Sequence, residues 1–298
     1  MKKVFVDCTP ELHELFESEN LSVPDDIEIH NGTYNDAELL AWCDGAETIM
    51  VEHTNIPDSV LADSQTLRHI VFMGTGAASY INLPLASRRG IKVSTVAGYG
   101  NRAVAEHAIA LMFAAARKIA QMDLEIRAGN WVPMSGIQLQ GKRLAVVGLG
   151  GVGLEVAGIG KALGMDVRGW SYTPLDAEFY RANLEEALED AEFVSVHLAL
   201  NPETSGLIDL RLLQLAKPGF IFVNTARDAL VKTDDFRLAL ESGLIGHAAL
   251  DVFDVEPLPA EHWLLGKSNV TLTAHAAYMT KEAYRSLWQK TVEKLAAG

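Results

Sequence analysis

Three polar segments late in the sequence carry side chains that could bind a carboxylate and donate a proton to a ketone. Arg227, the acids Asp251, Asp254 and Glu256, and His275 come shortly after predicted strands, where open parallel sheets build their sites. Hydride addition to a ketone needs a proton donor, which a histidine provides near neutral pH, and a carboxylate holds its tautomer and favours its protonated form. The planar fork of an arginine binds a carboxylate. Taken singly, an arginine is usually a surface residue, and one histidine among nine is more often a packing residue.

A glycine-rich turn follows an apolar run in the middle of the chain. Residues 144–147 lead into the pattern Gly148-x-Gly150-x-x-Gly153, and a helix-like stretch follows. Gly148 permits the tight turn, Gly150 lets the backbone approach a pyrophosphate, and Gly153 lets helix and strand pack closely. The free N–H groups of the helix N-terminus then face the phosphates. The turn therefore predicts dinucleotide binding; the alternative is a glycine-rich turn without a ligand.

The position that is expected to contact the ribose of a dinucleotide lacks the usual acid. An acid is expected about 20 residues after the glycine turn, where it binds the ribose 2′-hydroxyl. Ser171 stands there instead. A carboxylate would repel the 2′-phosphate of NADP, whereas a hydroxyl does not, so the sequence favours NADP or the use of both cofactors. The alternatives are that Asp176 compensates, or that NAD binds without the acid.

Short apolar runs alternate with amphipathic stretches along most of the chain, which predicts βαβ units and parallel sheets. A long helix is expected over residues 101–118, an irregular segment over 121–136, and a last helix over 281–297. The predicted strands are 3–8, 26–30, 48–52, 68–73 and 91–95, and then 144–147, 166–170, 193–197, 220–224, 248–252 and 270–273.

Composition excludes several classes of protein. The 298 residues carry a formal net charge of −14, which disfavours nucleic acid and anionic membranes as partners. Cys8 and Cys43 form no CxxC pair, so we expect a reduced, cytoplasmic environment and no metal site. The N-terminus lacks the apolar run of a signal peptide, and the apolar stretch 108–116 is far shorter than the roughly 20 residues of a membrane span.

Several motifs in order along the chain resemble the D-isomer-specific 2-hydroxyacid dehydrogenases, most strongly over residues 67–280. The resemblance implies two Rossmann- or flavodoxin-like parallel-sheet domains with the active site in the cleft between them. Residues 1–97 with 282–298 would form the substrate domain, and residues 98–281 the dinucleotide domain. The matching segments are Gly74-Thr75-Gly76, 89–93, 101–107, the glycine turn, His197 with 201–204, 224–227, 251–257 and His275.

The same resemblance implies a role for each matched residue. Arg227 would bind the substrate carboxylate and carbonyl, His275 would be the acid–base group, and Glu256 would pair with it. Backbone N–H groups of Thr75 and Gly76 would hold the carboxylate. Asp251 would hold the nicotinamide carboxamide. The other cofactor-binding positions would be Gly148, Leu149, Gly150, Gly151, Val152, Gly153, Ser171, Tyr172, Thr173, His197 and Thr225.

The sequence is most similar to the glyoxylate and hydroxypyruvate reductases of this family. Trp170-Ser171-Tyr172-Thr173 is similar to their Trp-Ser-Arg-Thr, with Tyr172 in place of the arginine. Two other positions depart from the family pattern: Asp228 follows Arg227 where a glycine is usual, and Tyr278 follows Ala277 where a small residue is usual.

These similarities predict a reductase of small 2-keto acids that uses NAD or NADP. It is expected to be a homodimer through its cofactor domain, with residues 127–131 as the dimer arm. The alternative is a dinucleotide-sensing interaction protein similar to the family's transcriptional corepressors.

Overall fold

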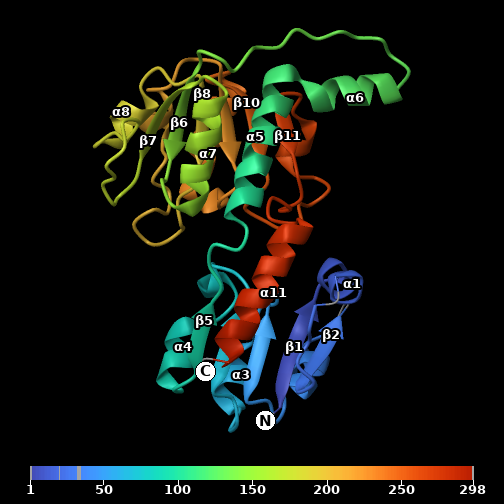
Figure 1. Ribbon diagram of the computed structural model, residues 1–298. Coiled ribbons are helices and arrows are strands. Elements are labelled where there is room, and N and C mark those ends of the chain that lie inside the picture. Colours follow the sequence, from blue (N-terminus) through green and yellow to red (C-terminus); the bar gives the residue numbers. More distant parts are fainter. Residues whose placement is uncertain (1, 20, 32–34, 297–298) are drawn as a thin grey trace. The chain divides into compact units, whose positions relative to one another are not determined.

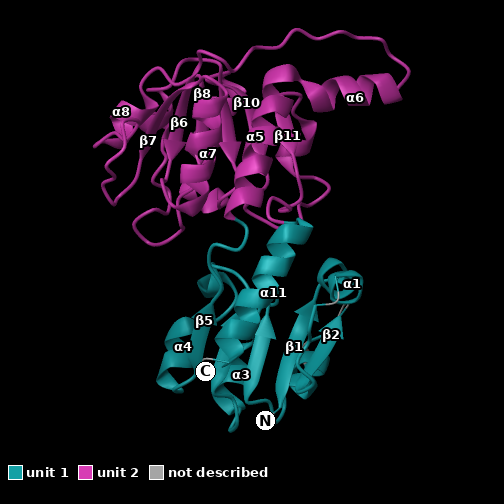
Figure 2. Ribbon diagram, viewed as in Figure 1, with its two compact units in different colours: residues 1–100, 279–298 teal, residues 101–278 magenta. Residues whose placement is uncertain are grey.

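The chain forms two α/β units. The computed structural model describes residues 2–19, 21–31 and 35–296. Unit 1 comprises residues 1–100 and 279–298, and unit 2 comprises residues 101–278 (Figure 2). Each unit contains one parallel sheet, which confirms the predicted fold class. The chain passes from unit 1 to unit 2 after Gly100 and returns at Met279, whereas the predicted substrate domain ended at residue 97 and resumed at residue 282.

Unit 1 is built on a five-stranded sheet in the order β2-β1-β3-β4-β5 (Figure 1). All four residues of β4 are buried, as expected for an inner strand of a parallel sheet covered on both faces. Its carboxyl end leads into the loop that carries Thr75 and Gly76. The strands are β1 (Lys3–Cys8), β2 (Ile27–Asn31), β3 (Thr48–Val51), β4 (His69–Phe72) and β5 (Lys92–Thr95).

Local capping sets the first helices of unit 1. The Thr9 hydroxyl accepts a hydrogen bond from the Leu12 N–H at 3.3 Å, and Pro10 occupies the first helical position. Asn35 and Glu38 form a capping box on the next helix. The helices are α1 (Pro10–Ser18), α2 (Asp36–Cys43), α3 (Asp58–Asp63), the 3-10 helix η1 (Ala77–Ser79), α4 (Leu83–Arg88) and α11 (Lys281–Ala296).

The C-terminal helix α11 completes the core of unit 1. Trp288 is only 2% exposed, and its ring lies 4.6 Å from that of Phe16 and 6.3 Å from that of Phe5. Its indole N–H donates to the carbonyl of Ser22 at 3.0 Å, which satisfies the buried polar atom. Segments from both ends of the chain therefore share one hydrophobic core.

Unit 2 is built on a six-stranded sheet in the order β11-β10-β9-β8-β6-β7. The first strand of this sheet along the chain is β6. β7 pairs with one side of β6, and the chain then crosses to the other side, where β8 pairs with β6 and β9, β10 and β11 follow. This reversal creates a switch point beside the carboxyl end of β6, where open α/β sheets bind ligands. The strands are β6 (Arg143–Val147), β7 (Asp166–Trp170), β8 (Phe193–Val196), β9 (Phe220–Asn224), β10 (Ile245–Leu250) and β11 (Val270–Leu272).

Helices cover both faces of the unit 2 sheet, so its apolar strands are buried on each side. One cluster of buried side chains joins the sheet to α5 and α7, and a second joins it to α8, α9 and α10. The elements are α5 (Asn101–Arg117), α6 (Ile119–Arg127), α7 (Gly151–Ala162), α8 (Leu184–Leu188), α9 (Leu210–Leu213), α10 (Thr233–Glu241) and the 3-10 helices η2 (Asp228–Leu230) and η3 (Trp263–Gly266).

The segment after α5 differs from the sequence expectation. We expected an irregular stretch over 121–136, but α6 extends to Arg127. Lys118 adopts the left-handed conformation (φ 52°), which ends α5 and starts α6 in a new direction. None of the residues of α6 is buried, so this helix adds no side chain to the core of unit 2.

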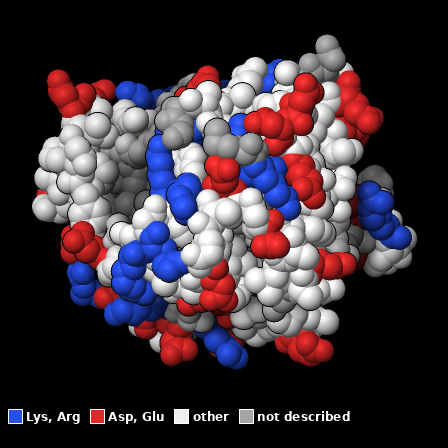
Figure 3. Space-filling model, turned by 90° about the horizontal axis from the view of Figure 1, so that it is seen from below, with Lys and Arg blue, Asp and Glu red and all other residues white. Residues whose placement is uncertain are grey.

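The surface of the chain is charged with both signs. On the face drawn in Figure 3, basic and acidic side chains are interspersed. Near the N-terminus, for example, Lys3 pairs with Asp26 at 2.7 Å and Lys2 with Glu28 at 3.6 Å. Within the described residues, no helix is both long and apolar enough to cross a membrane.

Candidate active site

Glu256 and His275 are in direct contact. The pairing of β10 with β11 places the loops that follow these two strands side by side. His275 Nδ1 lies 2.6 Å from Glu256 Oε2, and about a quarter to a third of each side chain is exposed. The carboxylate therefore fixes the imidazole ring through Nδ1, with Nε2 on the opposite side of the ring. This is the pairing that the sequence predicted.

The surroundings of Glu256 keep it ionised. Burial raises the pKa of a carboxyl group, but here hydrogen bonds from His275 and from the Phe253 N–H, at 2.9 Å, outweigh that effect. The positive charge of Arg227 acts in the same direction, and the net result is a pKa below the usual value for glutamate. The ionised carboxylate can therefore accept the Nδ1–H of His275 and hold the ring in one tautomer.

Arg227 belongs to the same polar cluster. It follows β9 and caps η2, with extended backbone angles (φ −150°, ψ 140°). The buried amide of Asn224 shapes this turn: its Nδ2 donates to the Arg227 carbonyl at 3.0 Å, and its Oδ1 accepts from the Ala226 N–H at 2.9 Å. The guanidinium donates to the carbonyl of Ala226 at 2.6 Å. Its side chain is partly exposed, which suits it to bind an anion.

Three further titratable groups lie around this cluster. Burial, followed by the charges of Asp254 and Glu256, raises the pKa of Asp228 to about 6. His262 Nε2 pairs with Asp254 Oδ1 at 3.1 Å. From the sequence, Asp228 was noted only as a departure from the family pattern, and Asp254 and His262 were not among the predicted site residues. Their proximity depends on the path of the long loop after β10.

Asp228→Asn should stabilise the protein at alkaline pH. The folded state raises the pKa of Asp228, so this group contributes stability below about pH 4 that is lost as pH rises through about 6. Removing the charge should raise the free energy of unfolding at pH 8 by about 1–3 kcal/mol and leave it unchanged at pH 4. Urea unfolding at both pH values measures this. The exposed acid Asp63, changed to Asn, is the control; an equal effect in both variants would contradict the argument.

The glycine turn after β6 has the shape of a pyrophosphate cradle. Gly148 has φ +103°, and a Cβ there would lie 2.7 Å from the backbone of His197 and Leu198. A Cβ on Gly153 would lie 1.8 Å from the Gly148 carbonyl oxygen, so the helix α7 packs directly on the turn. At Gly150, the N-cap of α7, a Cβ would extend into open space. Gly148 and Gly153 allow the turn and the helix to pack closely, and Gly150 leaves space beside the N-terminus of α7. The free N–H groups of that helix end can bind a pyrophosphate, so the turn fits a dinucleotide.

Other predicted cofactor positions surround the carboxyl edge of the unit 2 sheet. Ser171 Oγ donates to the Thr173 carbonyl at 2.6 Å, and Tyr172 is exposed. Burial lowers the pKa of His197, whose ring nitrogen lies 2.7 Å from Ser195 Oγ. Thr225 Oγ1 is buried and has no hydrogen-bond partner among the described residues. An orphaned buried hydroxyl is costly, so it supports a bound ligand at this position.

Asp251 has an arrangement that the sequence analysis did not anticipate. The residue has no exposed surface, and its carboxylate accepts hydrogen bonds from Thr273, Ala276 and Ala277. Its predicted contact with the nicotinamide stays a prediction. Its observed contacts are with the loop that carries His275.

Thr75 and Gly76 belong to unit 1, in the loop between β4 and η1. Thr75 is exposed, and among the described residues neither backbone N–H donates a hydrogen bond. Both groups are thus available for an anion, as their predicted role requires.

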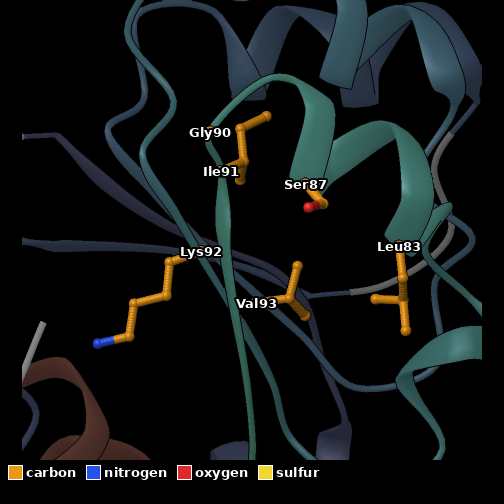
Figure 4. Close-up of a pocket in the computed structure, with 6 residues that line it drawn as sticks. All are labelled: Leu83, Ser87, Gly90, Ile91, Lys92 and Val93. Atoms are coloured by element: carbon orange, nitrogen blue, oxygen red, sulfur yellow. The ribbon is translucent and has the colours of Figure 1, made fainter.

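The pocket drawn in Figure 4 is a different feature of unit 1. It has a volume of about 360 Å³ and lies between α4 and β5, with Ser87 and Lys92 among its lining residues. The lysine amine points away from the other labelled side chains. The pocket contains none of the predicted site residues and lies near the amino end of β5.

The match to a known family decides the identification. The family model of the D-isomer specific 2-hydroxyacid dehydrogenase NAD-binding domain matches residues 109–277. The chain belongs to the D-isomer-specific 2-hydroxyacid dehydrogenase family. The resemblance stated from the sequence motifs is therefore confirmed. The protein is an oxidoreductase of this family whose cofactor is a nicotinamide dinucleotide.

Individual relatives of this 2-hydroxyacid dehydrogenase differ in their named substrates. A glyoxylate reductase from Aeropyrum pernix is 37% identical, over 80% of this chain and 75% of its own length. A D-3-phosphoglycerate dehydrogenase from Archaeoglobus fulgidus is 35% identical over 87% of this chain, which spans only half of that protein. The crystal structure of the TT0316 protein from Thermus thermophilus is similar with a TM-score of 0.86 and 31% identity, covering 99% of this chain and 96% of that one.

Proposed function

We propose that this dehydrogenase reduces a small 2-keto acid, glyoxylate or hydroxypyruvate, to the corresponding 2-hydroxy acid. The observation that carries the proposal is the His275–Glu256 pair, 2.6 Å apart, with Arg227 close enough to influence the carboxylate. A proton donor and a carboxylate-binding fork are the two groups that such a substrate needs from the protein.

Each residue has one task in the proposed reaction. The bound nicotinamide cofactor supplies the hydride that the carbonyl carbon receives. Arg227 binds the substrate carboxylate and orients the carbonyl. His275 donates a proton to the carbonyl oxygen, so that the alcohol forms without a free alkoxide. Glu256 stays ionised and stabilises the imidazolium before transfer.

A panel of keto acids tests the proposal. The purified protein is mixed with glyoxylate, hydroxypyruvate, pyruvate and phosphohydroxypyruvate, each with NADH and with NADPH, and the loss of reduced-nicotinamide absorbance is followed. We expect turnover with glyoxylate or hydroxypyruvate to exceed that with the phosphorylated acid. Cofactor binding without turnover of any acid would contradict the proposal and favour the dinucleotide-sensing alternative.

For the cofactor, we propose that the protein accepts NADPH as well as NADH, because Ser171 replaces the acid that would repel a 2′-phosphate. Ser171→Asp should weaken NADPH binding about tenfold or more by charge repulsion and leave NADH binding unchanged. Fluorescence titration with each cofactor measures both dissociation constants, and Ser171→Asn is the uncharged control. If the native protein fails to bind NADPH, the argument from Ser171 is wrong, and Asp176 becomes the candidate ribose ligand.

We also propose a homodimer that forms through the arm after α5. Leu124, Ile126 and Trp131 expose 67%, 52% and 87% of their surfaces, and an apolar surface of this kind is typical of an interface. A buried tryptophan is often an interface anchor worth about 2 kcal/mol or more. Trp131→Asp should therefore raise the dimer dissociation constant about 30-fold or more, as measured by analytical ultracentrifugation. Leu238→Asp, at an exposed position of α10, is the control. A monomeric native protein would contradict the proposal.

A further inference from the structure

The carboxylate of Asp251 is completely buried at the end of β10, where it holds the loop that carries His275. Oδ1 accepts from the Thr273 hydroxyl at 2.6 Å and from the Ala276 N–H at 3.0 Å, and Oδ2 accepts from the Ala277 N–H at 2.9 Å. The three donors flank His275 on both sides. Both carboxylate oxygens are thus used to fix the main chain around this histidine.

His275 itself has a backbone conformation that needs such support. Its φ is +50°, in the left-handed region, which costs a residue with a side chain about 1–2 kcal/mol. The next two N–H groups converge on one carboxylate, in the way that successive amides form an anion-binding nest. The buried anion therefore stabilises the conformation that sets the direction of the His275 side chain.

Helix α5 is connected to the same network. The Thr273 hydroxyl donates to Asp251, so it can only accept from His107 Nε2, which lies 3.0 Å away. His107 Nε2 is also 3.6 Å from Asp251 Oδ1. Burial raises the pKa of Asp251, but the nearby His107 ring, the Thr273 hydroxyl and the two backbone amides outweigh this effect, so the pKa lies below the usual value. The Asp251 carboxylate, which we call the clamp, is therefore ionised throughout the neutral pH range.

We propose that Asp251 is a positioning residue, which holds His275 in the geometry that proton transfer requires, with Thr273 and His107 orienting its carboxylate. The proposal rests on the proposed function, because it assigns the proton transfer to His275. A displacement of about 1 Å at a reacting group can lower the rate about 100-fold. Loss of the Asp251 contacts would disturb the 2.6 Å contact between His275 and Glu256.

Three variants test the clamp. Asp251→Asn keeps the shape but turns an amide group toward one of the backbone N–H donors. Thr273→Val removes the hydroxyl, whereas Thr273→Ser keeps it. Thr271→Val is the matched control, since Thr271 lies two residues before Thr273, on β11, and its hydroxyl contacts His247 at 2.9 Å. For each variant we would measure keto acid reduction against pH, the cofactor dissociation constant, and hydrogen exchange of the peptide covering residues 274–280.

We expect kcat to fall about 100-fold in Asp251→Asn and about tenfold in Thr273→Val. Thr273→Ser should recover most of the native rate. In Asp251→Asn and Thr273→Val, hydrogen exchange of the 274–280 peptide should become faster. The loss of the reduction rate with rising pH should also begin at lower pH, because His275 no longer contacts Glu256 in a fixed geometry. Cofactor affinity should be unchanged in Thr273→Val, and Thr271→Val should match the native protein in every measurement.

Two results would overturn the proposal. Native kcat and native exchange in Asp251→Asn would show that the carboxylate does not hold the loop. A defect confined to cofactor affinity would show that Asp251 acts on the nicotinamide and not on His275. If the native protein reduces none of the keto acids, the proposed function fails instead, and the exchange measurement alone decides whether Asp251 clamps this loop.

Discussion

Arg227→Lys should lower kcat/KM for the keto acid by about two to three orders of magnitude, which corresponds to roughly 3–4 kcal/mol of transition-state stabilisation. Lysine keeps the charge but loses the planar fork that binds a carboxylate through two parallel hydrogen bonds. The position is rigid as well, because Asn224 holds the main chain of residues 226 and 227. A flexible ammonium at this rigid turn cannot reproduce the same contact.

The measurement is steady-state reduction at saturating cofactor, together with the cofactor dissociation constant. Arg227 is proposed to bind the substrate, so cofactor affinity should hardly change. Arg237→Lys is the matched control, because Arg237 lies on the exposed side of α10 and pairs with Glu241 at 3.3 Å. Near-normal turnover in Arg227→Lys would remove this residue from the proposed mechanism.

The fold was predictable because its strands are short, apolar and separated by helical stretches. β6, β8 and β9 are almost wholly buried, so their sequences are largely apolar. Such strands can be recognised without knowing what packs against them. α6 shows the limit of this reasoning. Its apolar residues Ile119, Met122 and Ile126 recur at helical spacing, but none of them is buried and the irregular residues 128–136 follow directly, so the short pattern was not recognised.

The candidate site was predictable where it lies at strand ends and unpredictable where it depends on loop paths. Glu256 and His275 follow neighbouring strands, so a parallel sheet brings them together. By contrast, the pairing of Asp254 with His262 depends on how the loop after β10 turns. Asp251 shows a third case: the family resemblance implied a contact with the nicotinamide, and no sequence pattern indicated the buried carboxylate and the three hydrogen bonds that the structure shows.

His275→Ala should lower the rate of reduction by about two to four orders of magnitude, the usual contribution of a general acid. Reduction needs the protonated imidazole, so the native rate should fall as pH rises. Oxidation of the hydroxy acid needs the neutral imidazole, so its rate should fall on the acid side. The alanine variant should lose both dependences. If it keeps the native profile, another group delivers the proton, and Tyr278 becomes the next candidate.

Glu256→Gln tests how the proton donor is tuned. The folded protein lowers the pKa of Glu256, so the carboxylate is charged throughout the neutral and alkaline range and stabilises the imidazolium. Glutamine keeps the shape and a hydrogen bond but removes the charge. The imidazolium then loses its proton more readily, and the pH range over which reduction declines should move to lower pH. The variant should retain more activity than His275→Ala, because Glu256 is proposed to tune the donor without being it.

The pH profiles of the native protein and its variants are best compared above about pH 7. Asp228, with its pKa of about 6, is then already ionised and adds a constant charge to the cluster. Reduction is measured at saturating cofactor for the native protein, His275→Ala and Glu256→Gln. A lower rate in Glu256→Gln with an unmoved decline would show that the carboxylate orients the ring without stabilising its charge. A native rate and an unmoved decline would show that the 2.6 Å contact between Glu256 and His275 has no part in proton transfer, while His275 would remain the acid.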